Sequence, residues 1–348
     1  MRNFNNFVNV VEQLNEAELK IVANKILKML SNVGKDTVQT VESISKCRKC
    51  DSSQIVKFGK DKNGKQRYKC HSCGATFTST SFSVVSHSHC HEDKWEEYIK
   101  LLLQGSTLEH SAKMCHISIR TAFLWRHKIL SALQQDQDTR AMCGIVEADD
   151  MFFAISYKGN HKNSKKFVMP RAAFKRGSDN HAQIGHRACV MCAVERKGHT
   201  YGEVLGVGLA TQEMLSHAFK DRLAAESLVI TDKANNFKKY FEEQSIELVQ
   251  MGAHIKSRSQ KGPPEVRGVY HIQNVNNLHH RFRQFLQSYN GVATKYLNHY
   301  LNLYIWIENH KKIANVNLSE ELKESLKKQK SYLPSKAILD MPALPSVA

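Results

Sequence analysis

The sequence contains no apolar stretch close to the ~20 residues that a membrane-spanning helix needs. Its polar start, MRNFNNF, also lacks the apolar segment of a secretory signal peptide. We therefore expect no membrane partner and a cytoplasmic protein. Membrane and exported classes of protein are not expected.

Acidic residues are in the minority. Lys and Arg number 50 and Asp and Glu number 33, so the formal net charge is +17, with an isoelectric point near 9.4. Such a surplus predicts a polyanionic partner, of which nucleic acid is the commonest. The alternative is a generally basic surface. Because basic residues cluster in predicted loops, the sequence favours nucleic acid.

Cysteine is too scarce for a disulfide scaffold, but four of the nine cysteines form a metal-binding pattern. Cys47-x-x-Cys50 and Cys70-x-x-Cys73 flank a predicted hairpin, and two such knuckles predict a Zn²⁺-binding ribbon over residues 45–80. A redox pair is the alternative, and the matched second pair argues against it. The hairpin is basic, which predicts contact with DNA phosphates or a solvated basic face; its cations are Lys57, Lys60, Lys62, Lys65, Arg67 and Lys69.

Residues 91–135 have the pattern of three short helices. A capping box at residues 106–109 opens the second helix, and Ser118 can cap the third. This arrangement predicts a helix-turn-helix domain whose third helix enters the DNA major groove. An ordinary three-helix bundle is the alternative. The residues predicted to read bases are Arg120, Thr121, Arg126 and His127.

Acidic residues occur in two β-rich segments. Glu147, Asp149 and Asp150 lie in the first segment, which we interpret as two strands of a hairpin with the acids at or near the turn. Asp232 ends the second, a short strand from Ser227. A carboxylate in a sheet core is costly unless it is paired or binds a metal, so the pattern predicts a Mg²⁺ site. The alternative is that strands often end in Asp because turns favour it.

The rest of the chain supplies cations, thiols and helices. The basic loop between Lys158 and Arg187 contains two lysines predicted to bind the DNA backbone, Lys165 and Lys166. A second basic loop is predicted from Ala253 to Val269. Cys189 and Cys192 alternate within a strand pattern and are interpreted as buried structural thiols. Two helices follow, over residues 272–289 and 294–311; the first aligns Asn276, His280 and Arg283 on one face.

The order of these elements resembles insertion-sequence transposases of the DDE superfamily, in the ISXO-like branch with an N-terminal zinc ribbon. The motifs that carry the resemblance are CRKC…CHSC, TAFLWRHKIL, EADDMFFAISYKGN, VITDKANNF and HIQNVNNLHHRFRQFLQSYNGVATKYLNHYL. The resemblance implies an α/β catalytic core, an RNase H-like mixed sheet flanked by helices. The resulting organisation is a helical segment (1–44), zinc ribbon (45–80), helix-turn-helix (91–135), catalytic domain (141–312) and a basic, poorly ordered tail (313–348).

The resemblance also implies catalytic residues. Asp149 matches the first acid of the family, with Asp150 where Glu is common, and Asp232 matches the second. The third acid lies seven residues before a basic residue on a helix; Arg283 is that residue, so the third position is Asn276. Asparagine departs from the superfamily pattern, although some branches of this family carry it.

The implied activity is metal-dependent DNA cleavage and strand transfer at terminal inverted repeats. Mg²⁺ or Mn²⁺ would be held by Asp149, Asp232 and Asn276, and Arg283 would grip a phosphate. Water frees a 3′-hydroxyl at the element's end, and this hydroxyl attacks target DNA. The implied partners are the element ends, the target DNA and further copies of the chain in a synaptic complex. Two alternatives stay open: a decayed or domesticated DNA-binding regulator, and an RNase H-like nuclease that cuts without joining.

Overall fold

A computed structural model describes a large part of the chain in two units. The described residues are 44–61, 64–86, 88, 90, 92–134, 141–159, 187–196, 198–257, 260–264, 268–313, 316–329 and 332–344. The units comprise Met1–Ser79 and Thr80–Ala348. The predicted N-terminal helix and the loop with Lys165 and Lys166 lie outside the described residues. Within those residues, no helix is both long and apolar enough to cross a membrane.

The first unit contains a three-stranded antiparallel ribbon. Its strands are β1 (Ile55–Lys60), β2 (Gln66–Cys70) and β3 (Thr76–Phe77), in the order β1-β2-β3. The predicted hairpin is therefore present, with one further strand. Among the described residues of this unit, four side chains form the buried apolar core: Cys47, Tyr68, Cys70 and Phe77. So small a core contributes little to stability, which is the usual reason for a structural metal in a domain of this size.

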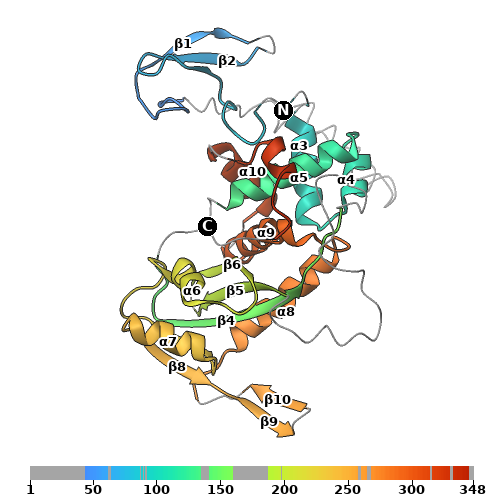
Figure 1. Ribbon diagram of the computed structural model, residues 1–348. Helices are drawn as coiled ribbons and strands as arrows, with labels where there is room; N and C mark the ends of the chain where they lie inside the picture. Colours follow the sequence, from blue (N-terminus) through green and yellow to red (C-terminus); the bar gives the residue numbers. More distant parts are fainter. Residues whose placement is uncertain are drawn as a thin grey trace, which may run out of the picture. The chain divides into compact units, whose positions relative to one another are not determined.

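The second unit contains a five-stranded mixed sheet. The strands are β4 (Ile145–Ala154), β5 (Arg187–Glu195), β6 (Thr200–Val207), β7 (Leu228–Asp232) and β8 (Glu247–Met251). Their order is β6-β5-β4-β7-β8; β4 is antiparallel to β5 and parallel to β7. This sheet with flanking helices confirms the predicted RNase H-like core (Figure 1).

The prediction of a hairpin turn at the acids is wrong. β4 is one continuous strand that pairs with β5 from Val146 to Ala154 and carries Asp149 and Asp150 in its interior. Composition alone suggested a turn because carboxylates are rare inside strands.

Helices cover both faces of the sheet. One face is covered by α6 (Gln212–Phe219) and α7 (Asn235–Glu243). The other face is covered by α8 (Gln273–Gln287) and α9 (Leu297–His310). A 3₁₀ turn, Thr294–Tyr296, precedes α9. Alternation along β4 divides its side chains between the two faces. Val146 and Ala148 pack in the α6–α7 core, whereas Met151 packs in the α8–α9 core. Asp149 therefore lies on the α8 face.

A two-stranded antiparallel sheet replaces the second predicted basic loop. It consists of β9 (Ala253–Ser257) and β10 (Gln260–Pro264). The loop prediction is wrong for these residues. The sequence QKGPP of β10 contains glycine, two prolines and no β-branched residue, so local composition gave no indication of a strand.

Three helices precede the sheet, as the sequence predicted: α3 (Glu92–Leu103), α4 (Leu108–Met114) and α5 (Ile119–Leu133). Side-chain oxygens cap the N-termini of α4 and α5. Thr107 accepts a hydrogen bond from the backbone N–H of His110, and Ser118 accepts one from Thr121. These caps fix where the chain turns between helices. All three helices belong to the same unit as the five-stranded sheet.

The prediction of a poorly ordered C-terminal tail is wrong. Two more helices, α10 (Leu318–Lys328) and α11 (Ser335–Leu339), join the core that α3, α5 and α9 form. Leu322 and Ile338 are completely buried there. Leucines spaced four residues apart in a Lys-rich segment are an amphipathic signal, which the basic composition concealed.

We predict that the C-terminal helices stabilise the second unit. Leu322→Ala should lower its free energy of unfolding by about 2–5 kcal/mol, because it removes fully buried methyl groups and leaves a cavity. The measurement is urea denaturation followed by circular dichroism. Leu209→Ala, at a leucine that is 61% exposed, is the matched control and should change stability little. Equal stability of both variants would contradict this role.

Candidate functional site

Two aspartates meet on adjacent central strands. Asp149 lies within β4, and Asp232 is the last residue of β7. The parallel register runs from Ile145 opposite Leu228 to Glu147 opposite Ile230. Continuing it by two residues brings Asp149 level with Asp232, so two residues more than 80 positions apart become neighbours.

The electrostatics of these acids are unfavourable without a cation. Burial, followed by the charges of Asp232 and Asp150, raises the pKa of Asp149 well above its ordinary value. Burial and the charge of Asp232 raise the pKa of Asp150 to about 6. Close carboxylates share one proton or one metal ion more readily than they share full negative charge. Clusters of this kind are typical of functional sites.

One face of α8 lies over Asp149. The His279 ring places Nδ1 3.7 Å from Asp149 Oδ2. Asn276 lies one turn before His279 and Arg283 one turn after it, so all three share this face. The positive charge of Arg283 opposes the rise in the pKa of Asp149. Both predicted helix residues, Asn276 and Arg283, thus belong to the face that lies over the acids.

Sequence reasoning missed His279 and selected its neighbour His280, which is exposed. His279 is only 4% exposed, and its Nε2 is buried without a hydrogen-bond partner. Burial and the charge of Arg283 lower the pKa of His279 to about 3, so the ring is neutral at pH 7. The sequence could have indicated that His279 is buried, because position 279 lies beside the apolar stripe of Val275, Leu278 and Phe282 on α8.

Glu147, the first acid of β4, has a structural role. Its carboxylate is completely buried, and Oε2 accepts hydrogen bonds from the backbone N–H groups of Asn274 (2.8 Å) and Val275 (3.3 Å). Oε1 accepts from Asn274 Nδ2 at 2.7 Å and Arg196 Nε at 2.8 Å. The N-cap residue of α8, Ile272, has no side-chain cap of its own. Glu147 therefore caps α8 from the sheet and neutralises Arg196.

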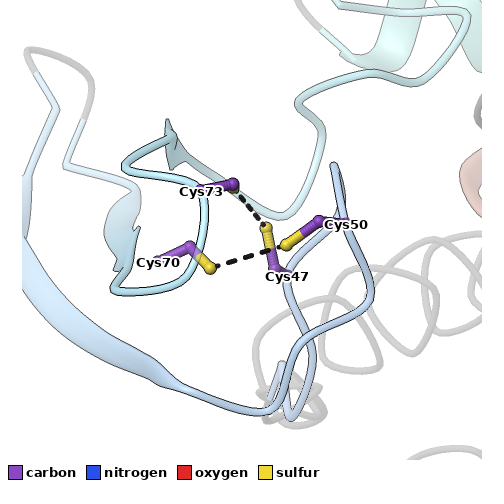
Figure 2. Close-up of side chains that lie close together, drawn as sticks. All are labelled: Cys47, Cys50, Cys70 and Cys73. Atoms are coloured by element: carbon purple, nitrogen blue, oxygen red, sulfur yellow. Dashed lines mark hydrogen bonds between the residues drawn. The ribbon is translucent and has the colours of Figure 1, made fainter.

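The four predicted zinc ligands converge (Figure 2). The Sγ atoms of Cys47, Cys50, Cys70 and Cys73 all lie within 4.8 Å of one another. Cys47–Cys73 and Cys50–Cys70 are each separated by 3.7 Å between sulfurs. A tetrahedral Zn²⁺ with bonds of about 2.3 Å requires sulfurs roughly 3.8 Å apart. The thiols, none of them in a disulfide, therefore fit zinc. Among the described residues this is the one such cluster of His, Cys, Asp or Glu.

The other CxxC pair cannot hold one metal. Cys189 and Cys192 are both completely buried on β5, but they pack in the cores on opposite faces of the sheet. Burial is the main cause that raises the pKa of Cys189 to about 12 and the pKa of Cys192 above its ordinary value. Both are protonated structural thiols, as the alternation in the strand predicted.

The four residues predicted to read bases differ in their exposure to solvent. Arg120 is exposed at the start of α5, and Thr121 is half-buried where its hydroxyl meets that of Ser118. Arg126 and His127 are 1% and 2% exposed, so the prediction that they read base edges in the major groove is wrong. The error arose from assuming one buried face, whereas α5 packs against α4 on one side and against α9 and α11 on the other.

The sheet, the paired aspartates and the helix over them have the arrangement expected of a transposase domain. More particularly, residues 141–309 match the family model described as the ISXO2-like transposase domain. These residues form a domain of this family, which confirms the resemblance of the motifs within them to insertion-sequence transposases of the DDE superfamily.

Similar proteins are otherwise distant. No curated protein matches the chain. The Mos1 strand transfer complex matches at 11% identity over 69% of this chain and 79% of that chain, with a TM-score of 0.25. The Mos1 transposase paired-end complex with left transposon end matches at 13% identity over 69% and 80%, with a TM-score of 0.26. At these TM-scores no property of Mos1 can be assigned to this chain.

We predict that zinc stabilises the ribbon alone. Cys47→Ser or Cys70→Ser should unfold residues 45–79 and leave the second unit folded, because structural Zn²⁺ can contribute about 10 kcal/mol or more. Metal analysis of the purified protein, with limited proteolysis of each variant, measures both effects. Cys143→Ser, at an exposed cysteine outside the ribbon, is the control. Protein purified without chelator and free of zinc would contradict the prediction.

Proposed function

We propose that the protein is a DNA transposase that binds the ends of its own element, cleaves them and joins them to target DNA. The observation that carries the proposal is the pair Asp149 and Asp232 on adjacent strands, under the face of α8 that bears Asn276. The transposase domain over residues 141–309 supports the class of reaction. Cleavage, strand transfer and the role of each residue belong to this proposal.

The acids and the amide suit divalent cations. Asp149 and Asp232 offer carboxylate oxygens and Asn276 offers a neutral amide oxygen, which are the ligands that Mg²⁺ and Mn²⁺ prefer. The raised pKa of Asp149 reflects burial and carboxylate repulsion, which a cation would relieve. When bound, such ions would polarise the scissile phosphate and activate the attacking oxygen. An amide adds no charge, so we expect weaker binding of the ion that Asn276 contacts.

The chain's own residues position the reacting groups. His279, neutral and buried, limits the rotamers open to Asp149. Glu147 fixes the first turn of α8, and hence the height of Asn276 above the sheet. Arg283 is exposed at the edge of this face, so its guanidinium can hold a DNA phosphate.

DNA recognition would begin at the exposed end of α5, where Arg120 is free to approach a groove. The net charge of +17 favours binding to the phosphate backbone at many sites. Lys165 and Lys166 remain candidates for such contacts. Two element ends must be held together for joining, so we also propose that further copies of the chain assemble on DNA.

We predict that Arg120 contributes to sequence recognition. Arg120→Ala should weaken binding to the element's end by about 1–3 kcal/mol and affect random DNA little. Lys165→Ala with Lys166→Ala should weaken binding to all sequences and flatten the salt dependence. Fluorescence anisotropy at several salt concentrations measures both, with Lys238→Ala, 57% exposed on α7, as control. Equal losses on both DNAs for Arg120→Ala would identify a phosphate contact instead.

We predict that Asp149→Ala abolishes DNA cleavage and leaves DNA binding intact, because it removes the proposed metal ligand but leaves α3 to α5 unchanged. Asn276→Ala should impair cleavage severely, with partial rescue at high Mg²⁺ or with Mn²⁺, which tolerates poorer geometry. The measurement is cleavage and joining of a plasmid that carries the gene with its flanking DNA, across titrations of both ions.

The matched control is Asn277→Ala, the exposed neighbour on the same helix, which should keep full activity. Full activity of Asn276→Ala would move the third ligand elsewhere. Cleavage by the wild type without joining would favour a nuclease, and absence of cleavage with either ion would favour a DNA-binding regulator.

A further inference from the structure

A pocket of about 610 Å³ lies apart from the acidic site, within the second unit. Residues of α4 and α5, the chain that follows β4 and the connection from α8 to α9 line it. Its lining includes three cations, Arg126, Lys158 and Lys295, and one carboxylate, Glu109. Burial and the charge of His299 hold the pKa of His127 well below its ordinary value, so this lining residue is neutral. Three positive charges less one negative charge leave a formal +2.

Arg126 at this pocket is a buried charge without a counter-ion. It is 1% exposed; Nη2 donates to the Ser106 carbonyl at 2.6 Å, and the guanidinium lies 5.2 Å from the centre of the Tyr289 ring. Its Nε is buried without a hydrogen-bond partner. In the described part of the chain no carboxylate forms an ion pair with it. Carbonyl and ring dipoles offset only part of the cost of burying a cation, so an anion beside it would be strongly favoured.

The two lysines are held at the same pocket. Lys158 Nζ donates to the backbone carbonyls of Asn290 (2.5 Å) and Gly291 (3.0 Å), which leaves one of its three N–H donors for a ligand. Lys295 Nζ lies 4.9 Å from the centre of the Tyr296 ring. Burial lowers the pKa of Lys295, and the charge of Asp340 opposes this effect. An anion in the pocket would favour the charged form of Lys295 as well.

The walls of the pocket are aromatic. Its lining includes Phe123, Tyr289, Tyr296 and Tyr300. Tyr296 packs edge-on against Phe123 with ring centres 5.6 Å apart, and Tyr289 does so against Tyr300 at 4.7 Å. These packed rings form a rigid apolar surface beside the cations. A phosphate ion alone would leave this surface and most of the volume unused.

We propose that the pocket binds one nucleotide, with its phosphate toward Arg126, Lys158 and Lys295 and its base against the tyrosine rings. Arginine and lysine bind phosphate, aromatic rings stack on bases, and the volume is in the usual range for small-molecule sites. The nucleotide is either a free mononucleotide or one unpaired nucleotide of a DNA strand. The DNA strand as a source rests on the proposed function. Phe123 and Arg126 lie within about two helical turns of Arg120 on α5, so DNA bound at Arg120 would pass near the pocket.

The first test uses the full-length, zinc-loaded protein and free dAMP in isothermal titration calorimetry. We expect saturable binding, and affinities at least about tenfold lower for deoxyadenosine and for inorganic phosphate, since each lacks half of the contacts. Lys158→Ala and Lys295→Ala should each lower the affinity for dAMP about tenfold, the loss expected for one charge-assisted hydrogen bond. Lys238→Ala on α7 is the matched control and should bind dAMP as the wild type does. Thermal melting verifies that each variant is folded.

The second test identifies the source. A DNA duplex with one unpaired 5′ nucleotide that carries 8-azidoadenine is photo-crosslinked to the protein, and the modified peptide is identified by mass spectrometry. Crosslinks to residues 289–300 support a DNA strand as the source, whereas dAMP binding without such crosslinks supports a free nucleotide. The proposal is overturned if neither dAMP binding nor these crosslinks occur, or if both lysine variants bind dAMP as well as Lys238→Ala. The dAMP arm needs no DNA cleavage, so its result is independent of transposase activity.

Discussion

The contact between the Glu147 carboxylate and the first turn of α8 is the constraint on which the position of α8 over Asp149 depends. Glu147 is buried in the central strand, two residues before Asp149, and its Oε2 atom accepts hydrogen bonds from the backbone N–H groups of Asn274 and Val275. A helix start without its own cap is thereby attached to the strand that bears the first aspartate. Asp149 follows Glu147 by two residues on the strand, and Asn276 follows Asn274 by two residues on the helix. These two spacings decide which side chains of the strand and the helix meet.

Uncompensated buried charge is the common feature of the two candidate sites. Around Asp149 the excess is negative, and burial with neighbouring carboxylates raises its pKa. Around Arg126 the excess is positive, and the surrounding tyrosines supply only weak acids and dipoles. The protein therefore keeps one place suited to a cation and another suited to an anion. Both lie in the second unit, on elements that pack against α8 or α9.

Helix α9 packs in the two hydrophobic cores that lie beside these candidate sites. Trp306, Leu303 and Tyr300 on one side belong to the core with α5 and α10, whereas Leu301 and Ile305 on another side belong to the core under the sheet. A helix buried on several sides transmits position between its neighbours because close-packed side chains allow little displacement. Helix α5, which carries Arg120 in its first turn, is consequently held in a fixed position relative to the acids. In a transposase this fixed position would set the distance between the recognised sequence and the scissile phosphate.

The sequence by itself determined the features that depend on local spacing. Two CxxC knuckles specify a tetrahedral thiolate site, Thr107 and Ser118 specify helix starts, and the motifs around Asp149, Asp232 and Asn276 identify the family, because few neighbours are needed to define each. Only the tertiary structure decided which side of each element is buried. Arg126 and His127 are buried because their helix packs on two sides, and the Lys-rich C-terminal segment forms helices because its leucines join a core. In the folded chain His279 lies beside Asp149, and Glu147 caps a helix. Each of these results from contacts between residues distant in sequence, which the pattern within one element does not record.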